Sequence, residues 1–306
     1  MPQLGPYGLS ENWMLRHLGD LHWQAICAAL GELSRDIRDE QGNRLYASFI
    51  RVTWTASQPL SQFGESSSLH GWMEMVRYGD GLFDSNTTLQ AGDASISVRM
   101  ASLFSRRERE NSNERLLPAS PMLPVECVIP DMEVLPGYLT DHRLLRTERL
   151  ASIELRGERF DLADTPAETV GYPINGYFDF NGASLLYFAS YPTIADICLS
   201  RSKAASRIGF ERFVTQCSPI GRDIFYFGNA NLEDSIDCSI ASRPAGNPAR
   251  CRIDMFRTSD RLCISRQFVL RAATCGNDQT RRTSCADPAA DDGLSPHCLA
   301  AIREAG

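Results

Sequence analysis

The sequence predicts an α+β fold in which a long apolar helix followed by an antiparallel sheet occurs twice in one chain. Three observations lead to this prediction. A segment with apolar residues at helical spacing precedes several strand-like segments in each half of the 306 residues. A charged and then proline-rich stretch separates the halves, and one strand–turn–strand segment has a similar partner in the other half. The composition, with 43% hydrophobic and 23% charged residues, is that of a globular protein.

The first predicted helix covers residues 11–30 (ENWMLRHLGDLHWQAICAAL), where apolar side chains recur at helical spacing. Ser10 is a suitable N-cap and Gly31 a suitable stop. Four strand-like segments follow, at residues 45–56, 69–78, 82–90 and 94–104. Their alternation and β-branched content favour antiparallel strands, and residues 78–81 (YGDG) predict a turn between two of them.

The second predicted helix covers the apolar segment 179–199 (DFNGASLLYFASYPTIADICL). Strand-like runs follow at residues 224–227, 235–241, 250–257 and 262–271. The sharpest internal match joins residues 74–83 to residues 254–263, where five of ten positions are identical or exchange Asp for Glu, at an offset of 180. The helical segments match at an offset near 168. We interpret these matches as a duplication, with chance similarity of two hairpins as the alternative.

Domain boundaries follow from the composition between the halves. Residues 106–124 are charged and then rich in proline, which is typical of a linker. We predict a first unit at 1–124 with this linker at its end, a second unit at 125–273, and a weakly structured tail at 274–306. Residues 182–199 are apolar on every helix face and must be buried. This is the outline of a double hot-dog fold, in which each sheet wraps one helix and the units pair through their sheets; separate α+β domains are the alternative.

Charge and hydropathy exclude several functions. A formal charge of −7 argues against a protein that binds nucleic acid or anionic membranes. The most apolar stretch, residues 183–189, is too short to span a membrane, and the N-terminus lacks a signal-peptide pattern, so we expect a cytoplasmic location. The ten cysteines are then expected to be reduced. Cys275, Cys285, Cys298 and His297 are too irregularly spaced for a zinc site, so no metal or other cofactor is predicted.

Candidate catalytic residues lie at the start of the second predicted helix. Asp179, Asn181 and Gly182 precede an apolar, aromatic run, which resembles the Asp-x-x-Gly pattern of hot-dog thioesterases. The free N–H groups of a helix start can hold a thioester oxygen as it becomes an oxyanion, and Gly182 would allow close approach to the backbone. Asp179 is expected to be a base, a nucleophile or a helix cap. Asn181 and Asn12, at comparable places in the two helices, are candidate amide donors to substrate or caps, and His70 is a candidate for facing the cleft between the units.

Three strings narrow the resemblance. SENWMLRHLGDLHW (10–23), NRLYASF (43–49) and DFNGASLLYFASYPTIAD (179–196) resemble the LnmK-type family, named for the acyltransferase/decarboxylase of leinamycin biosynthesis. The resemblance spans residues 9–270 and implies a double hot-dog enzyme of polyketide biosynthesis. It also implies decarboxylation of methylmalonyl-CoA and transfer of the propionyl group to the phosphopantetheine arm of an acyl carrier protein.

Tyr46 matches the position of the family's active-site tyrosine. We expect it to donate its O–H to the enolate formed when CO₂ leaves, or to attack the thioester as a phenolate. The first role is preferred because a phenol with an ordinary pKa of about 10 needs no activation to donate. A packing role in the strand is the alternative. The site is expected between the two units, with an acyl-CoA and an acyl carrier protein as partners and a homodimer left open.

Two other functions stay open. A hot-dog acyl-CoA or acyl carrier protein thioesterase would use Asp179 and release free acid, whereas a non-catalytic module would bind the carrier protein without turnover. A hot-dog dehydratase would need a histidine paired with a carboxylate, and no string here matches one. His22 is expected to be a core or interface histidine, and His17, His142 and His297 have no motif around them.

Overall fold

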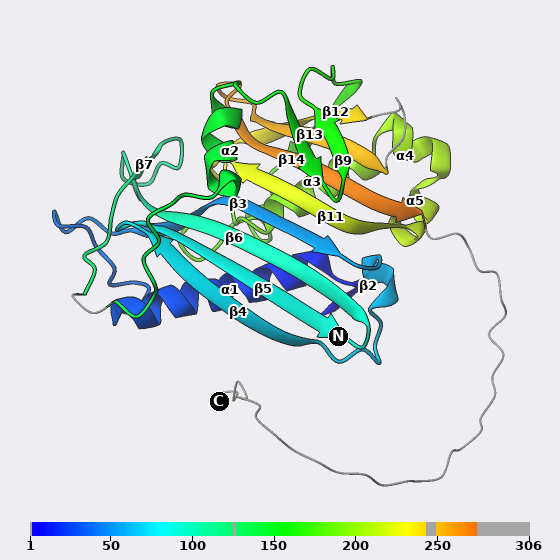
Figure 1. The fold of residues 1–306 in the computed structure, drawn as a ribbon. Coiled ribbons are helices and arrows are strands. Elements are labelled where there is room, and N and C mark those ends of the chain that lie inside the picture. Colours follow the sequence, from blue (N-terminus) through cyan, green and yellow to red (C-terminus); the bar gives the residue numbers. More distant parts are fainter. Residues whose placement is uncertain (1, 125–126, 243–248, 274–306) are drawn as a thin grey trace, which may run out of the picture. The chain divides into compact units, whose positions relative to one another are not determined.

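The first half of the chain forms one long helix and four long strands (Figure 1). The computed structural model describes residues 2–124, 127–242 and 249–273. α1 spans Glu11–Leu30; Ser10 caps it by accepting a hydrogen bond from the Trp13 N–H, and Gly31 ends it with a left-handed φ of 69°. The strands are β3 (Tyr46–Ala56), β4 (His70–Tyr78), β5 (Leu82–Ala91) and β6 (Ala94–Arg107). The first predicted helix and its four strands are confirmed.

The second half repeats this order with a shorter helix. α3 spans Ser190–Ser200, and two short helices, α4 (Lys203–Ile208) and α5 (Phe210–Gln216), connect it to the strands. The strands are β11 (Cys217–Tyr226), β12 (Ser235–Ser242), β13 (Arg250–Arg257) and β14 (Cys263–Ala273). The four strands predicted here are confirmed, and β11 begins earlier than expected.

The second helix begins later than predicted, because residues 179–189 form a loop. Asn181 Oδ1 accepts hydrogen bonds from the N–H groups of Ala183 and Leu185, at 3.0 and 3.1 Å, and Ser184 has a left-handed φ of 56°. A side-chain oxygen that binds backbone N–H groups locally competes with helix formation. The prediction that Gly182 lies at a helix start is therefore wrong.

Smaller elements lie before, between and beside the two halves. β1 (Leu4–Gly5) and β2 (Gly8–Leu9) precede α1, and η1 (Leu60–Gln62) follows β3. β7 (Leu116–Pro118) pairs with β6, so the predicted linker at 106–124 contains regular structure. The chain between the halves forms α2 (Gly137–Arg146), β8 (Ser152–Leu155), β9 (Glu158–Asp161) and β10 (Glu168–Pro173). The predicted tail at 274–306 lies outside the described residues.

The two halves share one antiparallel sheet. Its strands follow the order β10-β12-β13-β14-β11-β3-β6-β5-β4, with β7 paired to β6. The halves meet where Gly221–Phe225 of β11 pairs with Arg51–Thr55 of β3, a junction that we call the seam. On either side of the seam the order is the same, so β3, β4, β5 and β6 correspond to β11, β12, β13 and β14.

This correspondence corrects the internal sequence match. Residues 74–83 belong to the β4–β5 hairpin, whereas residues 254–263 belong to the β13–β14 hairpin. The topological counterpart of β4–β5 is β12–β13. The match therefore pairs hairpins that are not equivalent, and the similarity of the two strings does not reflect the structural repeat.

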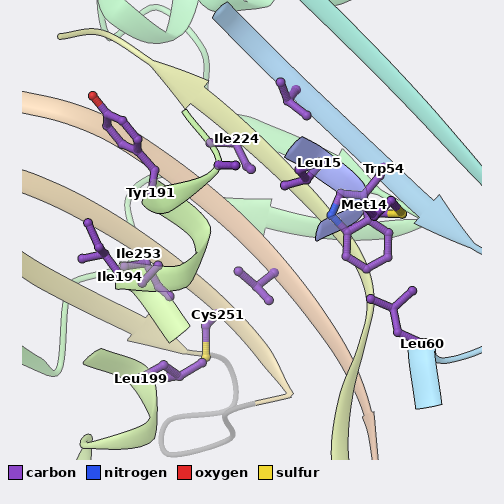
Figure 2. Packing of buried hydrophobic residues seen from close by; sticks show 14 of the residues in the cluster. Met14, Leu15, Trp54, Leu60, Tyr191, Ile194, Leu199, Ile224, Cys251 and Ile253 are labelled. Atoms are coloured by element: carbon purple, nitrogen blue, oxygen red, sulfur yellow. The ribbon is translucent and has the colours of Figure 1, made fainter. Parts of the chain in front are cut away.

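Both long helices pack on the same face of the sheet, in one core (Figure 2). Met14 and Leu15 of α1, together with Ile194 of α3, belong to the same buried cluster as Ile224 of β11 and Val52 of β3. Side chains alternate along a strand, so the neighbours of Ile224 point to the opposite face. There α2 and the β8–β9 hairpin cover the sheet through a second cluster (Leu145, Ile153, Leu155, Phe160, Phe225, Phe268 and Leu270).

A buried charge network joins the halves beneath the seam. Arg222 of β11 is fully buried and donates to both carboxylate oxygens of Glu11, at 2.6 and 3.0 Å, and to Asp196 Oδ1 at 2.7 Å. The Trp54 indole N–H also donates to Glu11, at 2.8 Å. The network therefore connects the first residue of α1 to β11 and α3, across the two halves.

Candidate active site

At one end of the seam β3 and β11 separate, and we call the space between them the fork. β3 begins at Tyr46, but its pairing with β11 begins only at Arg51, next to a bulge between Phe49 and Arg51. A cavity of about 540 Å³ lies in this fork. Its wall comes from the first five residues of β3, from the loop before α3, from residues 226–229 after the seam, and from the middle of α1.

One side of the cavity is apolar and aromatic. The rings of Phe49 and Phe188 lie 4.3 Å apart between centroids, and Tyr187 packs edge-on against Phe188. Phe188 lies directly against Gly19 of α1, where a Cβ atom would collide with its ring. Such a wall suits a hydrocarbon chain and excludes water from a group bound beside it.

Tyr46 lies in the cavity wall with its hydroxyl fixed by a cation. Arg107 donates from Nη1 to the Tyr46 hydroxyl oxygen at 2.8 Å, from Nη2 to the Ala183 carbonyl at 2.6 Å, and from Nε to Asn113 Oδ1 at 3.0 Å. A guanidinium group only donates, so the phenol oxygen accepts and its own O–H remains a donor. The predicted site residue Tyr46 thus carries a positioned donor in the fork.

His142, for which the sequence offered no motif, also lines the cavity. Its Nε2 donates to the Tyr226 carbonyl at 2.8 Å, and since a carbonyl only accepts, Nδ1 is the unprotonated nitrogen of the neutral ring. Burial beside Phe225 and Phe227 lowers the pKa of His142. The ring is therefore neutral at pH 7 and carries a free acceptor nitrogen.

His22 lines the same cavity but is fully engaged. Its Nδ1 and Nε2 lie 2.7 Å from Ser85 Oγ and 2.8 Å from Ser102 Oγ, and burial lowers its pKa to about 3. This agrees with the predicted role of a satisfied core histidine.

Asp179 and Gly182 do not line the cavity. The buried Asp179 carboxylate accepts from the Tyr172 hydroxyl at 3.0 Å and from the Asn175 N–H at 2.7 Å, and this contact together with burial raises the pKa of Tyr172. Asn181 does line the cavity, but its Oδ1 is held by the turn at 183–185. Of these three predicted residues, only Asn181 lines the cavity that contains Tyr46.

The two predicted substrate-binding residues Asn12 and His70 also lie outside the cavity wall. Asn12 Nδ2 donates to the Ala189 carbonyl at 2.8 Å and to Thr193 Oγ1 at 2.9 Å, which ties α1 to α3. His70 is exposed at the start of β4, the edge strand opposite the seam. Their roles in binding remain predictions that the geometry does not favour.

The described residues offer little other chemistry. No group of three or more His, Cys, Asp or Glu side chains within them is placed to hold a metal ion. Among their cysteines, Cys27, Cys127, Cys198, Cys217, Cys238 and Cys263 are free thiols, while Cys275, Cys285, Cys298 and His297 lie outside the described ranges. In the same ranges, none of the helices combines the length and apolarity needed to cross a membrane.

At the level of sequence, no protein-family model and no curated protein matches this chain. Several solved structures do resemble it. An acyl-ACP thioesterase from Bacteroides thetaiotaomicron is 11% identical over 87% of this chain and 91% of its own, with a TM-score of 0.54. A 12:0-ACP thioesterase from Umbellularia californica is 10% identical over 89% and 94%, with a TM-score of 0.54. A candidate oleoyl thioesterase from Lactobacillus plantarum is 9% identical over 88% and 90%, with a TM-score of 0.57.

Identities this low show a common fold and do not separate the LnmK-type family from other hot-dog proteins, so that resemblance stays a prediction. The fold itself agrees with the prediction: two helices on one face of a sheet that is continuous across the seam. The chain has the α+β double hot-dog fold.

Proposed function

We propose that the protein is an enzyme that acts on acyl thioesters of coenzyme A or an acyl carrier protein, with the acyl group in the fork cavity. The observation that carries this proposal is the Tyr46 hydroxyl, held by Arg107 beside an apolar wall. The three similar structures support the substrate class, because each is named for a thioesterase.

The chemistry follows from the position of the free Tyr46 O–H. A thioester carbonyl or an enolate oxygen placed beside it would accept its hydrogen, and that bond strengthens as negative charge develops on the oxygen. Arg107, whose guanidinium carbon is 4.8 Å from the Tyr46 ring centroid, adds positive charge at the same place. Both groups are already positioned, so they need no rearrangement during the reaction.

Hydrolysis is one reaction that this site would support, and the thioesterase structures favour it. The free Nδ1 of the neutral His142 would accept a proton from the attacking water. Tyr46 would stabilise the tetrahedral oxyanion, which collapses to the free acid as the C–S bond breaks and the thiol leaves with the proton taken by His142. In this version Asp179 stays outside the reaction, because its carboxylate is bound by Tyr172 and Asn175 and does not line the cavity.

Decarboxylation with acyl transfer is the second reaction, and the place of Tyr46 in the cavity favours it. A methylmalonyl carboxylate would be poorly solvated against Phe49 and Phe188, while the enolate left by CO₂ would be stabilised by the Tyr46 O–H. The enolate carbon would take a proton from water to give propionyl-CoA, and the phosphopantetheine thiol of a carrier protein would then form a new thioester with the propionyl group while the CoA thiol leaves with the proton.

One experiment separates the alternatives. Purified protein is incubated with methylmalonyl-CoA or with a straight-chain acyl-CoA, each with and without excess phosphopantetheinylated carrier protein, and the products are measured by mass spectrometry. A propionyl adduct on the carrier indicates decarboxylation and transfer, whereas free acid with an unloaded carrier indicates hydrolysis. In either case Tyr46→Phe should lose activity and Asp179→Asn should keep it. If the carrier protein is bound but no thioester is consumed, the protein is a non-catalytic module and the proposal fails.

A further inference from the structure

A second cavity, of about 420 Å³, adjoins the fork cavity. The two share part of their wall, formed by Arg115, Leu116, Arg146, Phe227 and Gly228. These five residues therefore mark the boundary at which the two cavities meet.

The second cavity is lined by four arginines and three acidic residues: Arg109, Arg115, Arg146 and Arg257 with Glu108, Glu114 and Asp260. Arg257 is already neutralised, because Asp260 accepts from its Nε at 3.0 Å and from its Nη2. Arg115 pairs with Glu108 at 3.0 Å, but the Arg115 side chain is largely exposed and that of Glu108 partly so, and such pairs are weak. Arg109 and Arg146 form no ion pair with any of the residues that the structure describes.

Arg115 and Arg146 thus offer uncommitted or weakly committed guanidinium groups at the boundary of the two cavities. Guanidinium groups bind phosphate oxygens through paired N–H donors, and this match is stronger than that with a single neutral acceptor. Leu116 and Phe227, in the same shared wall, provide apolar contact for the part of the ligand between its ends.

We propose that Arg115 and Arg146 bind the phosphate that adjoins the pantetheine arm of the thioester substrate. The inference rests on the proposed function: the thioester end lies beside Tyr46 and the arm runs along the shared wall to the phosphate. That phosphate is common to coenzyme A and to the phosphopantetheine of a carrier protein. The site therefore recognises both sources by the same group.

The test is calorimetric binding of three ligands that need no turnover: pantetheine, 4′-phosphopantetheine and coenzyme A. Arg146→Gln and Arg115→Gln should each weaken binding of the two phosphate-bearing ligands by the same factor, about five- to tenfold, and leave pantetheine within about twofold. Arg143→Gln is the matched control, because Arg143 is an exposed residue in the last turn of the same helix and lines neither cavity. It should bind all three ligands like the wild type.

Salt provides a second readout that a change in folding would not produce. The affinity of the wild type for 4′-phosphopantetheine should fall with added NaCl, and this dependence should be shallower in Arg146→Gln. Three results would overturn the proposal: no binding of 4′-phosphopantetheine by the wild type, equal weakening of pantetheine, or an effect on coenzyme A alone. The last would place the adenosine phosphates and not the shared phosphate at these arginines.

The failure of this inference is distinguishable from failure of the proposed function. Thioester turnover with unchanged binding in Arg115→Gln and Arg146→Gln would leave the function standing and remove the phosphate site. Phosphate-dependent binding without turnover of any thioester would leave the phosphate site standing and remove the proposed function.

Discussion

The same pair of strands forms both ends of the β3–β11 seam, but one end is filled by side chains and the other leaves a cavity. At one end, η1 and its neighbours fill the space: Leu9, Leu60 and Phe63 are buried, and the Ser61 N–H donates to Ser218 Oγ at 3.0 Å. At the other end the seam leaves the cavity that holds Tyr46. The fold thus provides a space at each end of the seam, and the loops at that end determine whether the space is filled. We infer that function belongs to the end where the loop at 179–189 replaces the start of a helix.

The largest expected effect comes from breaking the seam itself. Arg222→Met leaves the buried Glu11 carboxylate without its cation, whereas Asp196 keeps its ion pair with Arg271, and should lower the free energy of unfolding by about 3–5 kcal/mol. Arg159→Met, which removes an exposed pair with Asp161, should change it by less than about 1 kcal/mol. Urea titration of both variants measures the difference, and similar values would show that the network does not hold the halves together.

A substitution at the open end of the seam should lower the catalytic rate without lowering the stability of the fold. Tyr46→Phe removes the donor that Arg107 positions and should lower kcat about 100-fold, with unfolding changed little. Tyr172→Phe removes another anchored hydroxyl, one that binds Asp179 outside the cavity, and should retain activity. Steady-state kinetics compares the two variants, with the thioester that the mass-spectrometry experiment shows to be consumed as the substrate. A larger loss in Tyr172→Phe would move the site toward Asp179.

The filled end should lose stability without losing catalysis. Gly8 has a φ of 121°, and a Cβ there would press on the Leu60 carbonyl oxygen and the backbone of Ser61. Gly8→Ala should therefore destabilise the fold by about 2 kcal/mol. Gly31→Ala is the control, because Gly31 also has a left-handed φ but open surroundings, and it should lose only about 1 kcal/mol. Equal losses in thermal unfolding would show that the contact with η1 is not tight.

A pH-dependent prediction concerns His22, which lines the cavity at the open end. Burial lowers the pKa of His22 to about 3, while an unfolded histidine titrates near about 6.5. Between these values the unfolded chain binds a proton that the folded chain does not, so stability falls as pH decreases below 6.5. The contribution has a limiting slope of about 1.4 kcal/mol per pH unit. His22→Gln should show a shallower decline in urea titrations between pH 6.5 and 4.5; an unchanged slope would contradict burial of a neutral ring.

The sequence predicted elements whose signals are local. α1 has the predicted bounds, because Ser10 and Gly31 act on neighbouring backbone groups. The start of α3 was misplaced because Asn181 binds the N–H groups of Ala183 and Leu185, and that choice between turn and helix is invisible in an apolar string.

The site depended on contacts between distant residues. Tyr46 was found through a family resemblance, and the structure places it in the cavity. Arg107 was missed because it lies in the stretch predicted as a linker and meets Tyr46 from 61 residues away. His142 has no local signal at all: only its bond to Tyr226 and its place in the cavity wall reveal it.

The fork has a further consequence for what fills it. Residues 46–49 of β3 pair with β6 on one side but have no strand partner in the described chain on the β11 side. The cavity is therefore bordered by a short strand edge without a strand partner, whose peptide groups can form hydrogen bonds with water or with a ligand in the space. A wholly hydrocarbon ligand would displace water from those peptide groups and form no hydrogen bonds with them. A ligand that carries amide groups can form hydrogen bonds with this edge as an added strand would, and this favours it over a wholly hydrocarbon ligand.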